Sequence, residues 1–174
     1  MKRVSGIVLI ILSIAAFGFR YAQKVEFKQN VSGHLKRAAD ASTIELAHEE
    51  LSQVVDYLEA NNLTSGSTSI MYETPNEDID FWYRNIKASR DELQNKNLKT
   101  QLEKTNVLIK LRETLLDTGE RTKVTIPKGL SVYPHNLAWG LGMLAATIAL
   151  FVGLSILAVD WDAAIKAKEA AKAD

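Results

Sequence analysis

The chain has 174 residues, with 21 basic and 21 acidic side chains and no cysteine. Its length is that of one domain, and its zero formal net charge gives polyanions such as nucleic acids no bulk attraction. The lack of cysteine excludes disulfides, thiol catalysis and thiolate metal sites.

The first apolar segment runs from Val4 to Phe19 and directly follows two basic residues. A helix of roughly 20 apolar residues crosses a bilayer, and basic side chains at its ends can extend to the headgroups. A cleaved signal peptide has a similar pattern, but its only small-x-small site, at 16–18, is a poor one. We therefore expect a retained transmembrane helix over residues 4–22, after a short N-terminus of residues 1–3.

The next segment predicts an exoplasmic helical hairpin over residues 23–120. Its first helix covers about 24–61, where apolar residues spaced 3-4-3-4 form a heptad seam. The seam consists of Ile44, Ala47, Leu51, Val54 and Leu58. Upstream, an apolar stripe of Val31, Leu35 and Ala38 is out of phase with this seam.

The second predicted helix covers about 75–118. It begins with a capping box, in which Thr74 is the N-cap, Pro75 the first helical residue and Glu77 the third. Asn95-Lys96-Asn97 indicates a kink. The predicted buried stripe contains Ile79, Trp82, Ile86, Leu93, Leu98, Leu102, Thr105, Ile109 and Leu116. The two helices are expected to pair as an antiparallel, coiled-coil-like hairpin, which places the loop 62–73 at the tip far from the membrane.

Charge is distributed unevenly along this hairpin. From Ala38 to Tyr83 the chain has ten carboxylates and no Lys or Arg. The membrane end of the hairpin is expected to be basic, and anionic lipids attract such residues. An ordinary solvated surface is the alternative. The residues of this predicted basic surface are Lys24, Lys28, Lys36, Arg37, Lys99, Lys104, Lys110 and Arg112.

Aromatic and acidic residues gather near the predicted tip. Three consecutive rings on a helix cannot share one face, and exposed rings beside carboxylates are typical of protein interfaces. A small core that seals the tip with Ile70 and Met71 is the alternative reading. The candidate partner-binding residues are Tyr72, Glu77, Asp78, Asp80, Phe81, Trp82 and Tyr83.

An extended lead-in at 121–136 precedes the second span, at 137–159, and a tail at 160–174 follows it. The span contains no charged residue, and Trp139 and Trp161 lie at its two edges, where aromatic rings favour the headgroup layer. Small residues spaced four apart predict close packing against another helix. These residues are Ala138, Gly142 and Ala146, and separately Ala145, Ala149 and Gly153.

Two spans put both termini on one side of the membrane. Basic residues near the two ends, such as Lys2 and Lys166, favour a cytoplasmic location for the termini. The central domain would then lie in the periplasm, a lumen or the cell exterior.

These features predict a mainly α membrane protein that is not an enzyme. We expect a subunit or scaffold whose hairpin docks on a larger membrane complex or on further copies of itself, with lipid and protein as partners. No nucleic acid, small-molecule substrate, cofactor or metal is expected. A metal-dependent enzyme is a remote alternative, since Glu45 and His48 form a single Glu-x-x-His pair where a di-iron bundle has two.

The layout also allows a second interpretation. Two terminal spans around a helical exoplasmic domain, with Pro127 and Pro134 before the second span, resemble polysaccharide co-polymerases. The chain is shorter and lacks their repeated prolines, so the resemblance covers layout alone. It implies an oligomer that organises the bilayer or regulates polysaccharide chain length.

Overall fold

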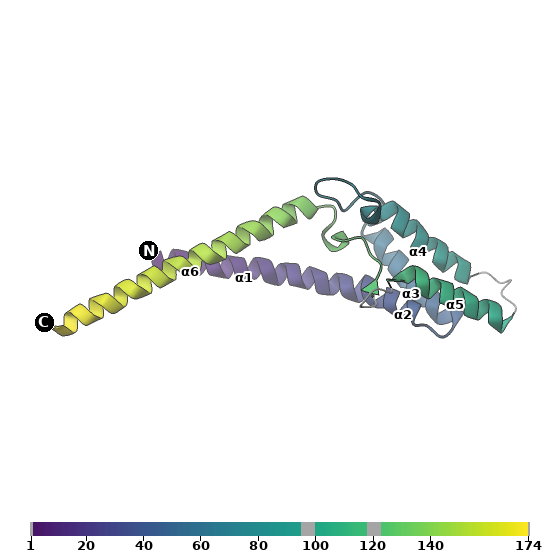
Figure 1. The fold of residues 1–174 in the computed structure, drawn as a ribbon, viewed down its shortest axis with the longest axis horizontal. Coiled ribbons are helices and arrows are strands. Elements are labelled where there is room, and N and C mark those ends of the chain that lie inside the picture. The colour runs from purple at the N-terminus through teal and green to yellow at the C-terminus, as the bar shows by residue number, and fades with distance from the viewer. Residues whose placement is uncertain (1, 95–99, 118–122, 174) are drawn as a thin grey trace. The chain divides into compact units, whose positions relative to one another are not determined.

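The computed structural model describes residues 2–94, 100–117 and 123–173 and is mainly helical (Figure 1). The chain divides into a helix pair, Met1–Ala22 with Leu137–Asp174, and a domain, Gln23–Asn136. Two helical segments, near the two ends of the chain, are long and apolar enough to cross a membrane. The predicted helical class and the presence of such a segment near each end are confirmed.

The helix pair consists of α1 (Lys2–Phe27) and α6 (Asn136–Ala173), which pack along a seam of small residues. The backbones approach closely where Gly6 of α1 meets Gly153 of α6. Residues that are at least half-buried follow a 3-4 spacing, which keeps one stripe of a helix facing its neighbour. They include Gly6, Leu9, Ser13 and Ala16 on α1, and Trp139, Met143, Ala146, Leu150, Gly153 and Leu157 on α6.

The outward face of the helix pair is apolar. Its exposed side chains include Val4, Ile7, Val8, Ile11, Leu12, Leu141, Leu144, Ile148, Phe151 and Val152. The hydroxyls of Ser13, Thr147 and Ser155 donate to the carbonyl four residues earlier. Polar groups within a helix are thereby satisfied without water, as a hydrocarbon environment requires.

In the domain, the predicted first helix is wrong as a single helix. Within the described residues it consists of the π-helical turn η1 (Lys28–Ser32), α2 (Gly33–Ala39) and α3 (Ile44–Ala60). The chain reverses between Asp40 and Thr43, so that α2 packs against α3. The out-of-phase stripe on α2 is buried against the α3 seam, which explains why the two stripes do not form one continuous line.

Thr43 fixes this break, because its side chain accepts a hydrogen bond from the Leu46 N–H at 3.2 Å. Replacing an N-cap Thr with Ala costs about 1 kcal/mol, because a backbone donor loses its acceptor. We expect Thr43→Ala to lower the free energy of unfolding by about that amount in chemical denaturation. The exposed neighbour Ser42 supplies the control Ser42→Ala, and equal losses in the two variants would refute a capping role.

The second predicted helix is also divided. It comprises the 3-10 turn η2 (Pro75–Glu77), α4 (Ile79–Leu93) and α5 (Gln101–Leu115). The N-cap of α4 is Asp78, which accepts from the Phe81 N–H at 3.0 Å, and not Thr74 as predicted. Thr100 forms a complete capping box that starts α5 as a new helix. The predicted kink at 95–97 lies outside the described residues.

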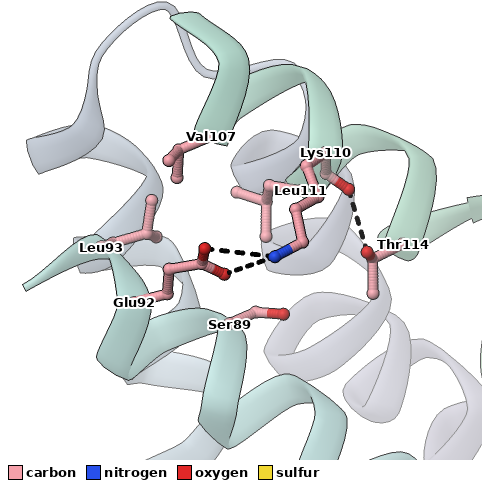
Figure 2. A pocket seen from close by; sticks show the side chains of 7 residues that line it. All are labelled: Ser89, Glu92, Leu93, Val107, Lys110, Leu111 and Thr114. Carbon is pink, nitrogen blue, oxygen red and sulfur yellow. Dashed lines mark hydrogen bonds and ion pairs between the residues drawn. The ribbon is translucent and has the colours of Figure 1, made fainter. Parts of the chain in front are cut away.

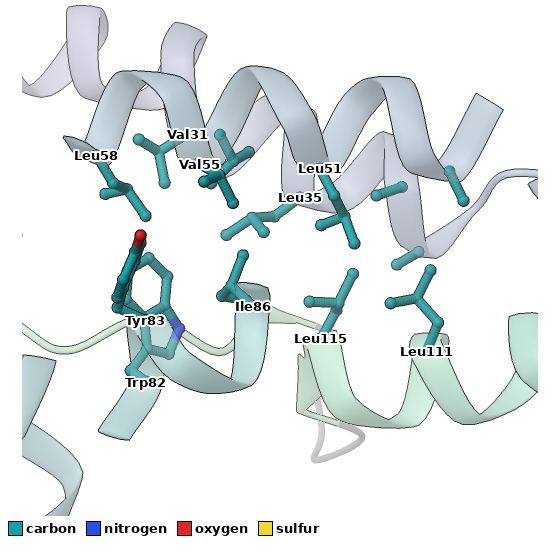
Figure 3. Close-up of a cluster of buried hydrophobic side chains, with 14 of the residues drawn as sticks. Val31, Leu35, Leu51, Val55, Leu58, Trp82, Tyr83, Ile86, Leu111 and Leu115 are labelled. Carbon is teal, nitrogen blue, oxygen red and sulfur yellow. The ribbon is translucent and has the colours of Figure 1, made fainter. Parts of the chain in front are cut away.

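The domain core lies between these four helices rather than along a two-helix hairpin (Figure 3). The predicted seam of α3 and the predicted stripe of α4 are buried. On α5 the prediction is wrong, because Leu102, Thr105 and Ile109 are exposed while Leu111 and Leu115 enter the core. Leu116 is buried as predicted, and Leu98 lies outside the described residues. Since α5 starts afresh at its own cap, its apolar phase does not continue that of α4.

The lead-in to the second span folds onto the domain. Strand β1 (Leu116–Asp117) pairs antiparallel with β2 (Lys123–Val124), and the short turn η3 (Leu130–Val132) follows. The Trp82 indole of α4 donates to the Thr125 carbonyl at 2.7 Å. This bond fastens the lead-in to the helical core.

The loop between α3 and α4 is in contact with the end of the lead-in. The loop follows the C-terminal end of α3, and Tyr133 of the lead-in lies against its Gly66. The turn at 40–43 precedes α3, whose 17 residues place the two loops about 25 Å apart. The loop thus lies beside residues of the lead-in, and its distance from the membrane stays a prediction.

Candidate functional site

The predicted aromatic site is divided between core and surface. Trp82 and Tyr83 are buried, whereas Phe81 points outward with 58% of its surface exposed. Tyr72 is exposed, and Glu77, Asp78 and Asp80 are half-buried around the start of α4. The structure thus brings the predicted residues to one end of the domain, but two of the three consecutive rings serve the core.

Tyr83 belongs to a cluster with Glu59 of α3 and Lys87 of α4. The Tyr83 hydroxyl donates to Glu59 Oε1 at 2.5 Å, and Lys87 Nζ lies 3.1 Å from the same oxygen. The hydrogen bond from Tyr83 lowers the pKa of Glu59. Burial raises the pKa of Tyr83, and its hydroxyl raises the pKa of Lys87. These shifts favour the ionised forms of Glu59 and Lys87 and the neutral form of Tyr83. The cluster therefore links α3 to α4 through an ion pair and a hydrogen bond.

This cluster predicts how stability depends on pH. A carboxyl with a lowered pKa stabilises the fold above its ordinary pKa, so the contribution of Glu59 is lost as pH falls below 4.5. The pKa values of Tyr83 and Lys87 are raised, so these groups stabilise the fold below their ordinary pKa values of 10.0 and 10.5. Their contributions are lost as pH rises above those values. In urea titrations across pH, Glu59→Gln should show a shallower acid decline than the unchanged chain. Superimposable acid limbs would contradict this assignment.

A second charged cluster joins α2 to α3. The side chain of Glu50 is 6% exposed, and its oxygens lie 2.6 Å from His34 Nδ1 and 2.5 Å from Arg37 Nη2. A buried carboxylate needs such partners, because burying an unpaired charge is costly. The cluster therefore has a structural role.

Three residues of the predicted basic surface are paired with carboxylates of the domain itself. Arg37 pairs with Glu50, Lys110 with Glu92 of α4 at 3.2 Å, and Arg112 with Asp40 at 2.9 Å. Lys24, Lys28 and Lys36 are exposed, Lys104 is half-buried, and Lys99 lies outside the described residues. The expected row of like charges is in part a set of ion pairs between helices.

The described part of the domain is hollowed in at least two places. One, between α4 and α5, has a volume of about 20 Å³ and lies beside the Lys110–Glu92 pair (Figure 2). It has room for about one water molecule. The other is an open groove of about 450 Å³ in the α3–α4 loop, lined by Gly66, Ser67, Glu73, Thr74, Pro75 and Asp78. No group of three or more His, Asp or Glu among the described residues is placed to hold a metal ion.

Two surfaces of the described domain expose large apolar side chains. Sequence reasoning missed one of them, and for the other it gave Tyr72 as a partner-binding candidate, with Ile70 and Met71 in an alternative buried core. One is the α5 face of Leu102 and Ile109, which are 70% and 52% exposed. The other is the loop segment of Ile70, Met71 and Tyr72, which are 53%, 90% and 76% exposed. The Thr100-x-x-Glu103 capping box could have revealed the first, because a new helix start resets the apolar phase.

In the helix pair, the predicted small residues are divided between two faces. Ala146 and Gly153 are buried and Ala149 is half-buried, whereas Ala138, Gly142 and Ala145 are exposed. Phe19 stacks on Trp139 with ring centroids 5.8 Å apart. Arg3 forms an ion pair with Asp160. Close backbone contact, a ring stack and an ion pair thus all contribute to holding the pair together.

Comparison of the chain with protein families, with curated proteins and with solved structures finds no match. The described residues present helix faces and an apolar loop rather than an enclosed cavity with converging polar groups.

Proposed function

We propose that the chain is a non-enzymatic integral membrane subunit or scaffold whose domain docks on a protein partner. Its two spans would place the termini in the cytoplasm and the domain in the periplasm, a lumen or the cell exterior. The exposed apolar face of α5 is the observation that carries the proposal. The partner is a larger membrane complex or a second copy of the chain.

The α5 face has the spacing of a helix that packs against another surface. Leu102, Thr105 and Ile109 follow an i, i+3, i+7 pattern, and all three are exposed. Such a stripe packs against a neighbour when a helix is amphipathic, yet here the opposite face of α5 already fills the core with Leu111 and Leu115. A helix that lies between the core and a partner needs an apolar stripe on each of these two faces.

A photo-crosslinking amino acid at Thr105 tests this proposal in native membranes. The matched control carries the same group at Gln53, an exposed position on α3. We expect a discrete adduct from position 105 and none from position 53. An adduct of twice the chain mass would identify a second copy, and any other mass a different protein. Equal labelling at both positions, or no adduct at 105, would overturn the proposed docking face.

A further inference from the structure

We propose that the α3–α4 loop inserts Ile70, Met71 and Tyr72 into the headgroup layer of the membrane that the spans occupy. The loop would form a third attachment, which holds the domain against the bilayer surface. This inference depends on the two spans and not on the docking face of α5.

The composition of the loop suits a lipid interface. The chain has no charged residue from Asn61 to Tyr72. Within this stretch lie three consecutive large side chains that are more than half exposed, at 70–72. Aromatic rings with a polar group favour the boundary between headgroups and hydrocarbon, so Tyr72 is the residue type expected there. In water these side chains would keep a contiguous apolar surface exposed.

The loop is held in a defined position by its neck. The Thr68 N–H donates to the Glu77 carbonyl at 3.0 Å, and the Ile79 N–H to the Gly66 carbonyl at 2.9 Å. Ser67 and Asp78 form an antiparallel bridge between these bonds. At the end of the loop, the Ser69 hydroxyl donates to the Tyr72 carbonyl. The three apolar side chains therefore project from a closed neck and not from a free chain.

Contacts within the domain place this neck beside the entry to the second span. Gly66 has a φ of +102°, and the Tyr133 hydroxyl occupies the space that a side chain at position 66 would need. Thr68 is buried beside Gly129, whose carbonyl accepts from the Asn136 side chain at 3.0 Å. The loop thus packs on the last residues of the domain.

Chain connectivity brings this contact close to the membrane. Leu137, the first residue of the apolar segment, is only four residues after Tyr133. Four residues span at most about 14 Å, even when fully extended. Each headgroup layer adds roughly 5–8 Å outside the hydrocarbon core. If α6 crosses the bilayer, Gly66 therefore lies within reach of the surface, and the residues at 70–72 can enter it.

The attraction would be apolar rather than electrostatic. Glu73, Glu77 and Asp78 follow the exposed segment, so anionic lipids gain nothing from the loop. Insertion should therefore occur in zwitterionic vesicles, should be no stronger in anionic ones, and should not weaken at high salt. Binding through basic residues would show the opposite dependence, because anionic lipids attract them.

A spin label measures the depth of the loop directly, because the chain has no native cysteine. Met71→Cys is labelled in the full chain, with Ser42→Cys at the far end of α3 as the water control and Ile148→Cys as the membrane control. Met71 is almost fully exposed, so the substitution leaves the fold intact. The chain is reconstituted in phosphatidylcholine vesicles at a large lipid excess that separates copies.

We expect collisions with oxygen relative to a water-soluble nickel chelate to rise in the order Ser42, Met71, Ile148. Adding Met71→Asp to a chain labelled at Tyr72→Cys should return that label to water. A Met71 label as accessible to the chelate as the Ser42 label would overturn the proposal. Protection of the Met71 label from the chelate that vanishes on further lipid dilution would also overturn it, because a second copy would then cover the surface. A label at Ile148 that the chelate reaches would show that the segment does not span the membrane.

Discussion

Trp82→Ala should lower the free energy of unfolding by about 3–5 kcal/mol, because it empties a large volume in the domain core. Trp82 is 7% exposed and packs within the cluster that includes Ile86 (Figure 3). The substitution also removes the donor that satisfies the Thr125 carbonyl at 2.7 Å. Urea titration of the detergent-solubilised chain, followed by circular dichroism, measures the loss.

The adjacent residue provides the control for this prediction. Phe81 lies on the same helix but is largely exposed, so Phe81→Ala should change stability by less than about 0.5 kcal/mol. Trp82→Phe keeps an apolar ring and loses the bond to Thr125, so an intermediate loss is expected. Similar losses for positions 81 and 82 would contradict the division of the aromatic run between surface and core.

Gly153→Leu should separate α1 from α6 and destabilise the helix pair by about 1–3 kcal/mol. A side chain at position 153 would meet the Gly6 carbonyl oxygen at 2.8 Å and Ile10 Cγ1 at 2.9 Å. Backbone cannot move aside as a flexible side chain does, so the helices must part. Unfolding in lipid–detergent bicelles by added dodecyl sulfate measures the change.

Gly142→Leu makes the same chemical change on the same helix. Nothing lies within 4 Å of a side chain at position 142, so this variant should retain the stability of the unchanged chain. Gly142 and Gly153 were both predicted to pack against another helix, and the pair of variants distinguishes them. Equal destabilisation would show that the α1–α6 seam does not pass through Gly153.

Local patterns predicted much of this fold. The apolar segments at both ends depend on length and hydropathy, and the 3-4 seam of α3 and the first stripe of α4 depend on periodicity. Each of these could be read from the sequence, because burial on a helix follows residue spacing. The predicted burial of Ile79 and Leu51 is confirmed.

The helix breaks were harder to predict because cap residues compete with periodicity. Thr43 and Thr100 each start a helix within what looked like a continuous pattern. Once a helix restarts, its apolar phase is free, which is why Ile109 is exposed although it matched the predicted stripe. If Thr100-x-x-Glu103 is taken as a helix start in the same way as Thr74, the sequence predicts a new helix there, with an apolar phase of its own.

The position of the loop could not be predicted from local sequence at all. It depends on Tyr133 packing against Gly66, a contact between residues far apart in the chain. The membrane insertion that we propose for the residues at 70–72 depends on this long-range contact.

Two spans around one domain are the central claim, and labelling of single cysteines tests it most directly. Lys2→Cys, Ser42→Cys and Lys168→Cys are each treated with a membrane-impermeant maleimide in sealed membranes whose exoplasmic face is accessible. We predict that Ser42→Cys is labelled at once, and that the two terminal cysteines are labelled only after the membrane is opened. Labelling of all three in the sealed membranes, or of one terminus without the other, would contradict two spans around one domain.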